Sequence, residues 1–390
     1  MPDRIARLKH DFRELFNSAP SAIVRSPGRV DLLGVHTDYN EGFVLPAAIN
    51  VDVLAGGRLR NDDTIAVYSA NFESKVEFPL DAIEFDNVNT WSNYVRGVIR
   101  FLQEAGVKLR GADIVLHGNV PIGSGLSSSA AIEMAVGFLM QTLVGFEMSG
   151  ADLALIGQRA ENKFVGVNTG IMDQFISRLG KKDHVLFLDC RTLSYEHLPL
   201  DTSALKIVVC DTMKRRGLVD SEYGLRRSQC EEAARLFGQW IPNVTALRDV
   251  SVADFEFHKK KLPDVTRKRA EHVIHENERV LESREALKAG DYQEFARLLD
   301  ACHESARDLY EVSCAELDTM VEVCRAAPGA TCARLTGAGF GGCTVSLVRD
   351  EFVGAFLDAT REGYAKRTGL VPSLYVCTAE DGASVVASDL

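Results

Sequence analysis

The sequence predicts an α+β fold in two lobes, and two observations support this prediction. The chain has 390 residues, the length of two ordinary domains, and its 46% hydrophobic and 25% charged residues are a normal globular balance. Short β-rich runs alternate with helical patterns in the first half, whereas long helical patterns fill 267–312 in the second. We expect the two lobes to span residues 1–200 and 201–390.

The predicted first lobe begins with a charged amphipathic helix over 1–16, which lacks the apolar centre of a signal peptide. A short strand at 22–25 leads into a turn at Ser26-Pro27-Gly28. Further strands are predicted at 51–55, 64–68, 112–117 and 184–189, and helices at 91–102, 130–144 and 151–164.

The predicted second lobe has buried-strand patterns at 205–211, 344–348 and 373–377, and helical patterns at 220–233, 267–289, 292–312 and 351–366. His272 and His275 lie three positions apart on one of these helices. No cysteine or second histidine pair accompanies them, so we expect surface residues and not metal ligands.

A loop rich in glycine and serine, between a predicted strand and a predicted helix, is the first candidate site. Its sequence over 121–131 is Pro-Ile-Gly-Ser-Gly-Leu-Ser-Ser-Ser-Ala-Ala. The two glycines let a ligand approach the backbone, and the three serines supply hydroxyls at N-cap positions. The first amides of a helix lack intrahelical partners and face its positive dipole end. The pattern favours a phosphate site over a plain capped turn.

Composition excludes several other classes of protein. The formal net charge of −11 argues against a general nucleic-acid surface. No apolar run approaches the ~18 residues that a membrane span needs. The nine cysteines are odd in number and form no Cys-x-x-Cys pair. These features predict reduced, buried thiols and a cytoplasmic protein without membrane or nucleic-acid partners.

Two further segments complete a resemblance to a known family. The 121–131 loop resembles the second motif of the GHMP small-molecule kinases and lacks the Gly-x-x-x-x-Gly-Lys-Ser/Thr pattern. Residues 28–42 closely resemble the galactokinase signature, and 334–343 resemble the third GHMP motif. The glycines at 337, 339 and 342 precede a strand pattern, whereas a dinucleotide fingerprint needs a helix there.

The resemblance implies a fold and a reaction. The first lobe should be like ribosomal protein S5 domain 2 and the second ferredoxin-like, with the site between them. The reaction should be transfer of the γ-phosphate of ATP to the anomeric hydroxyl of galactose, in the presence of Mg²⁺. The protein could be a monomer or a dimer.

The resemblance also implies roles for individual residues. Asp173 and Arg29 would be catalytic, while Val35, His36, Asp38, Gly170 and Tyr223 would face the sugar. ATP would contact Gly123, Ser124, Gly125, Leu126, Ser127, Ser128, Ser129 and Trp91. Magnesium would be held by Ser128 and Glu161.

Two positions depart from the family pattern. Asp31 replaces the usual asparagine, and Val35 replaces the glutamate that contacts the hydroxyl on C6. A valine cannot accept a hydrogen bond, so sugar preference should loosen or shift there. The alternatives are a kinase for L-arabinose or a 6-deoxy sugar, a non-catalytic sugar and ATP sensor, and a nicotinamide enzyme that uses the glycines at 337–342.

Overall fold

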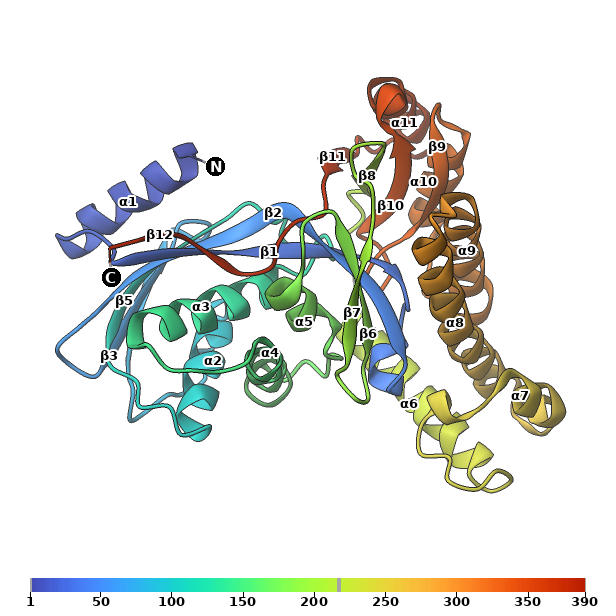
Figure 1. The fold of residues 1–390 in the computed structure, drawn as a ribbon, viewed down its shortest axis with the longest axis horizontal. Helices are drawn as coiled ribbons and strands as arrows, with labels where there is room; N and C mark the ends of the chain where they lie inside the picture. The colour runs from blue at the N-terminus through green and yellow to red at the C-terminus, as the bar shows by residue number, and fades with distance from the viewer. Residues whose placement is uncertain (1, 216–218, 390) are drawn as a thin grey trace.

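The protein has two lobes, each built around its own β-sheet (Figure 1). The structure is a computed structural model and describes residues 2–215 and 219–389. In the first lobe an eight-stranded sheet has the order β12-β1-β2-β5-β3-β4, with β6 paired to β2 and β7 paired to β6. Its strands are β1 (Ala22–Leu33), β2 (Phe43–Leu59), β3 (Thr64–Ser69), β4 (Ser74–Pro79), β5 (Ala112–Gly118), β6 (His184–Asp189), β7 (Tyr195–Pro199) and β12 (Ser384–Ser388).

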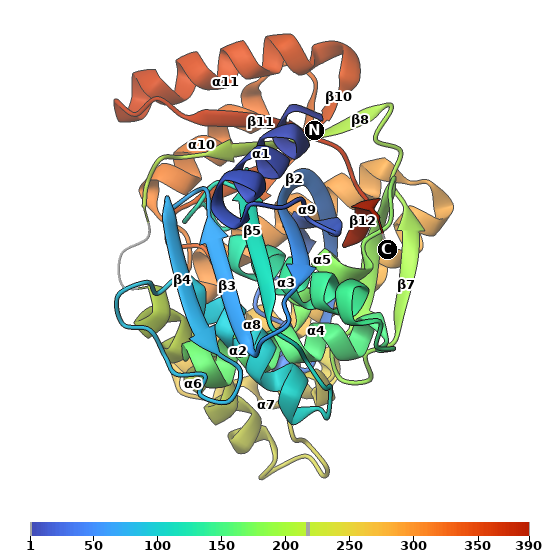
Figure 2. The ribbon, with the colours of Figure 1, turned by 90° about the vertical axis from the view of Figure 1, so that its left-hand side faces the viewer.

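Helices cover both faces of this sheet. Helix α1 (Pro2–Phe16) lies on one face, where Leu8 and Phe12 are fully buried against Ile23, Leu54 and Val115. The opposite face carries α2 (Ser92–Glu104), α3 (Ser128–Val144), α4 (Gly150–Arg159) and α5 (Met172–Leu179), as Figures 1 and 2 show. Helix α3 is apolar almost all round because it packs on β1 and β2 and against its neighbouring helices.

Strand β1 corrects one expectation from the sequence. The predicted turn at Ser26-Pro27-Gly28 is instead part of a continuous strand, Ala22–Leu33, which pairs with β2 across register shifts at 27–29 and 31–33. Proline is tolerated here because a bulge interrupts the ladder. As a result Arg29 lies on a buried strand and not in a loop.

The second sheet is antiparallel, with the order β11-β8-β10-β9. Its strands are β8 (Leu205–Asp211), β9 (Ala330–Leu335), β10 (Cys343–Arg349) and β11 (Ser373–Cys377), and α10 (Ala315–Ala326) and α11 (Val353–Thr368) pack on it. The helices that precede this pair are α6 (Val219–Phe237), α7 (Val252–His258), α8 (Asp264–Ala289) and α9 (Tyr292–Ser305). Helices α8 and α9 run side by side and contact β1 of the first lobe.

The chain ends in the first sheet, a feature that we did not predict. Strand β12 pairs antiparallel with β1, in the register Ala22↔Ser388. The division of the chain near residue 200 therefore remains a proposal, with β12 as a segment beyond it that returns to the first sheet. Among the described residues, no helix is both long and apolar enough to span a bilayer.

Candidate active site

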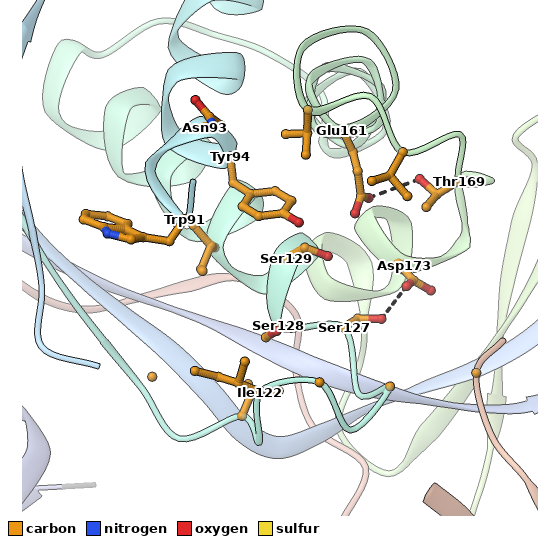
Figure 3. Close-up of a pocket in the computed structure, with 18 of the residues that line it drawn as sticks. Trp91, Asn93, Tyr94, Ile122, Ser127, Ser128, Ser129, Glu161, Thr169 and Asp173 are labelled. Carbon is orange, nitrogen blue, oxygen red and sulfur yellow. Dashed lines mark hydrogen bonds between the residues drawn. The ribbon is translucent and has the colours of Figure 1, made fainter. Parts of the chain in front are cut away.

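A cleft of about 1280 Å³ is lined by residues of both lobes. Arg29 of β1, the 123–129 loop and Asp173 of α5 contribute from the first lobe. Tyr223 of α6 and the loop that follows β9 contribute from the second. Figure 3 shows how Ser127, Asp173, Glu161 and Trp91 surround this space.

Arg29 contacts both Asp173 and the 123–129 loop. Its Nε and Nη2 donate to the two carboxylate oxygens of Asp173, at 2.7 and 2.6 Å, and its Nη1 donates to the carbonyl of Gly125 at 2.6 Å. Only 6% of the Arg29 side chain is exposed, compared with 22% for Asp173. The Ser127 hydroxyl also donates to Asp173. This two-point, charge-assisted pairing fixes the carboxylate in one orientation at the first turn of α5.

The 123–129 loop, called the phosphate loop after its predicted role, lies directly on strand β1. The Arg29 amide donates to the Leu126 carbonyl at 3.1 Å, and a Cβ on Gly28 would lie 2.7 Å from that oxygen. Gly123 and Gly125 have φ angles of +71° and +88°, which side chains disfavour. The loop therefore needs glycine both for its own conformation and for the strand beneath it.

Ser127 does not cap the helix as expected. Helix α3 begins at Ser128, and its N-cap residue Ser127 has a φ of +60° and makes no side-chain cap hydrogen bond. Its hydroxyl turns to Asp173 instead. The first amides of α3 therefore receive no side-chain cap from Ser127, which is the condition for an anion to bind there.

Two predicted loop contacts have side chains turned away from the cleft. Ser124 is fully buried and its hydroxyl donates to the Pro121 carbonyl at 2.7 Å. Leu126 is 1% exposed and packs in the core. Only the backbone of these two residues is left to contact a nucleotide.

Glu161 lies in a short π-helical segment, Ala160–Val165, that follows α4. Its Oε2 accepts from Gln174 Nε2 at 2.7 Å and from Thr169 Oγ1 at 3.1 Å. Burial first, and then the nearby Asp173 carboxylate, raises its pKa to about 7, while hydrogen bonds from Ser129, Gln174 and Thr169 oppose that rise. In Figure 3 the Ser129 hydroxyl points toward Glu161, which makes Ser129 a candidate partner beside Ser128.

A second buried carboxyl lies behind Glu161 and was missed from the sequence. Glu133 of α3 is fully buried, and its Oε2 accepts from Gln174 Nε2 at 2.9 Å. Burial raises the pKa of Glu133 well above its usual value. The sequence signal was a lone acidic residue in the apolar helix pattern of 130–144, and its partner Gln174 lies 41 residues further along the chain.

The residues predicted to face the sugar come together in the cleft. His36 Nε2 lies 3.0 Å from the Ala338 carbonyl and its Nδ1 lies 2.9 Å from the Tyr39 hydroxyl. The ring of Tyr223 is 5.3 Å from that of His36. The glycine cluster at 337–342 therefore lies at the site, and it connects β9 to antiparallel β10 without a helix.

Asp38 and Gly170 are in direct contact. A Cβ on Gly170 would lie 1.9 Å from Asp38 Oδ2, so only glycine fits beside this carboxylate. Burial, followed by repulsion from Asp173, raises the pKa of Asp38 to about 7. The carboxylate also accepts from the Tyr39 amide at 2.9 Å.

The two departures from the signature also line the cleft. Val35 is 2% exposed and offers only methyl groups to it. Asp31 is 1% exposed and is 3.4 Å from the fully buried guanidinium of Arg334. Burial raises the pKa of Asp31, and the Arg334 charge opposes the rise.

Trp91 lies at the start of α2, at the end of the cleft away from Asp173 (Figure 3). Its ring stacks on that of Phe72, with centroids 5.9 Å apart and planes 7° apart. Phe72 and Ile122 are exposed hydrophobic side chains on the same cleft. This end presents apolar and aromatic surface, which suits a planar base.

Three family models match separate parts of the chain. The model of the galactokinase galactose-binding signature matches residues 10–59, that of the GHMP kinases N terminal domain matches 93–181, and that of the GHMP kinases C terminal matches 283–364. A galactokinase of Chloroflexus aurantiacus is 47% identical over 96% of this chain and 96% of its own length. The chain belongs to the galactokinase family.

Further relatives agree with this assignment. A galactokinase of Roseiflexus is 45% identical over 96% of this chain and 95% of its own length. The crystal structure of Lactococcus lactis galactokinase complexed with galactose superposes with a TM-score of 0.93 at 36% identity, covering 97% of this chain and 99% of that one. Mevalonate kinase of Methanococcus jannaschii, at 19% identity and a TM-score of 0.64, shares the fold. Both expectations, the GHMP kinase fold and the family, are confirmed, and membership of a kinase family implies the use of ATP.

Proposed function

We propose that this chain transfers the γ-phosphate of ATP to the anomeric hydroxyl of galactose. The observation that carries this proposal is the position of Arg29, which binds both oxygens of Asp173 and the backbone of the phosphate loop. A proton acceptor, a fixed cation and a phosphate-binding helix end thereby meet in one cleft. Phosphoryl transfer needs mainly this positioning and charge stabilisation.

In the proposed reaction Asp173 accepts the proton of the anomeric hydroxyl. The hydroxyl oxygen forms a bond to the γ-phosphorus, and the bond from that phosphorus to the bridging oxygen of ADP breaks. Arg29 orients the Asp173 carboxylate through two hydrogen bonds and offsets charge on the transferring phosphoryl group. His36, Asp38, Gly170 and Tyr223 orient the sugar, and the amides of 123–129 hold the phosphates.

The donor set fits magnesium. Glu161 and the hydroxyl of Ser128 or Ser129 are hard oxygen donors, and Mg²⁺ takes few protein ligands when phosphates complete its shell. Among the residues that the structure describes, no cluster of three histidine, cysteine or acidic side chains could hold a metal alone. We therefore propose that Mg²⁺ binds together with the nucleotide and supplies charge neutralisation on the phosphates.

The experiment is a coupled assay of ADP release with ATP and one sugar at a time. Galactose, L-arabinose, D-fucose and N-acetylgalactosamine form the panel, and Asp173→Asn serves as the inactive control. We expect the highest kcat/KM for galactose. No ADP release with any sugar, together with measurable galactose binding, would instead indicate a sensor.

Val35 favours a second candidate, a kinase that also accepts sugars without a C6 hydroxyl. The apolar, buried side chain offers no partner for that hydroxyl. A site without the polar partner discriminates weakly against an analogue that lacks the group. Equal kcat/KM for galactose and L-arabinose in the panel would favour this candidate.

A further inference from the structure

One face of α8 is hydrogen-bonded to the backbone of the 34–43 segment. The face consists of His272, Glu276 and Asn277, which all lie within six residues on the helix. None of these side chains is more than 6% exposed. They come from the middle of the second half of the sequence, yet they contact the connection between β1 and β2.

Each of the three side chains binds a different backbone group. The Gly34 amide donates to Glu276 Oε1 at 2.8 Å, and the Phe43 amide donates to Asn277 Oδ1 at 3.0 Å. His272 Nε2 lies 3.1 Å from the Val35 carbonyl. A carbonyl only accepts, so Nε2 carries the proton, and Nδ1 of the neutral ring accepts from the Ser305 hydroxyl at 2.8 Å.

The connection between these anchor points has a strained backbone. Gly34 and His36 have φ angles of +95° and +61°, and a left-handed conformation is unfavourable for a non-glycine residue such as His36. Such a conformation persists only where surrounding contacts over-determine it. The α8 face provides those contacts on both sides of His36 and Asp38.

We propose that His272, Glu276 and Asn277 are positioning residues, which hold the 34–43 segment so that Val35, His36 and Asp38 meet the sugar. The proposal rests on the proposed function, since it takes that segment as the sugar side of the site. None of the three side chains lines the cleft. Their effect should therefore reach the sugar through backbone placement alone and leave the nucleotide side unchanged.

His272→Phe tests the proposal, with His275→Phe as the matched control. Phenylalanine keeps the ring that packs 4.5 Å from Tyr310 but removes both hydrogen bonds. His275 lies on the same helix, half-buried against Phe255 and outside the cleft. Losing a buried hydrogen bond to the Val35 carbonyl should raise the galactose KM about tenfold.

The expected pattern has three parts. His272→Phe raises the KM for galactose while the KM for ATP stays within about twofold. His272→Gln, which keeps an N–H donor, restores part of the loss, and His275→Phe behaves like the wild type. A fall in thermal stability with an unchanged galactose KM, or an equal rise in both KM values, would overturn the proposal in favour of a merely structural role.

Galactose binding by calorimetry separates this proposal from the proposed function. If the wild type binds galactose but releases no ADP, the proposed function fails, and weaker galactose binding by His272→Phe than by His275→Phe still supports the positioning role. If the wild type turns over galactose and the two variants bind it equally, the positioning role fails alone.

Discussion

At the scale of single residues, the site concentrates carboxyl groups that repel one another. Asp173, Asp38, Asp31 and Glu161 all line the cleft, and Arg29 is the guanidinium that binds one of them there in two hydrogen bonds. Asp173 raises the pKa of both Asp38 and Glu161, after the larger effect of burial. Carboxyl groups whose pKa is raised by burial and by a neighbouring carboxylate are typical of a functional site.

Asp173→Asn should lose most turnover without unfolding the protein. The amide cannot accept the proton of the anomeric hydroxyl, a contribution of about 10²–10⁴-fold in typical enzymes. Its size is unchanged, and the Asp173 side chain is 22% exposed, so the fold should tolerate it. The measurement is kcat with galactose beside a thermal melt, and wild-type kcat would exclude the role of base.

Sugar use should depend on pH through Asp38. Its ordinary pKa of 3.8 is raised to about 7 by burial and by Asp173 and Asp31, against the opposing effects of Arg29 and the Tyr39 amide. Below pH 7 the carboxyl group in the free protein carries a proton, so it accepts hydrogen bonds from sugar hydroxyls less well. The kcat/KM for galactose should therefore fall toward acid pH, with an apparent pKa near 7.

Asp38→Asn is the control for that pH dependence, because it removes the titrating group. The acid limb with a pKa near 7 should then disappear, and its persistence would assign it to another group. The raised pKa of Asp38 also makes the stability of the protein depend on pH. The folded protein holds a proton that the unfolded chain releases between about pH 4 and 7, so this group's contribution to the free energy of unfolding falls as pH rises through that window.

At the scale of elements, the phosphate loop shows how far a local pattern can be trusted. The strand, glycine loop and helix of 112–144 were predicted and are present as β5, the loop and α3. The predicted role of the serines as caps was wrong for Ser127, because its backbone is left-handed where a cap residue is extended, and its hydroxyl donates to Asp173, 46 residues away in sequence. The preference of serine for helix caps reflects only neighbouring residues in the sequence, so it cannot predict a hydrogen bond to a residue on another helix.

Gly123→Ala should weaken ATP binding, with Gly145→Ala as the matched control. Both glycines have positive φ angles, +71° and +79°, and in both cases an added Cβ has open space around it. Each variant should lose about 1 kcal/mol of stability from backbone strain. Only Gly123 lies in the phosphate loop, so only its variant should raise the KM for ATP, and an equal KM in both would contradict the assignment of the loop.

At the scale of the whole molecule, the lobes are joined by buried polar contacts. Arg334 of β9 donates to the Leu32 carbonyl of β1 at 2.5 Å and lies 3.4 Å from Asp31. Thr336 also exchanges hydrogen bonds with the backbone of Asp31. The strand that carries Arg29 is thereby fixed to the second lobe, and the cleft between them keeps its shape.

Arg334→Leu should destabilise the protein by about 3–5 kcal/mol, because it leaves Asp31 buried without its charged partner. Adding Asp31→Leu should recover part of that loss. Arg367→Leu is the control, since its pair with Glu322 is 46% and 58% exposed and should be worth less than about 1 kcal/mol. Urea unfolding measures all four proteins, and equal effects of Arg334→Leu and Arg367→Leu would contradict the argument.

The sequence by itself determined the family, the order of most elements and the motifs that line the cleft. Glycines at positive φ, apolar periods and the signature segments are local features, so they can be recognised without a partner. Arg29, Asp173, His36 and Gly170 were predicted in this way, and the structure places them at one cleft.

Tertiary structure alone decided what surrounds them. His272 was expected on the surface and is fully buried against the Val35 carbonyl, and burial lowers its pKa to about 4. Strand β12 and the α8 face act on segments more than 200 residues away in sequence. The roles of β12 and of the α8 face depend on which chain segments come into contact after folding. A local pattern of polar and apolar residues does not predict such contacts.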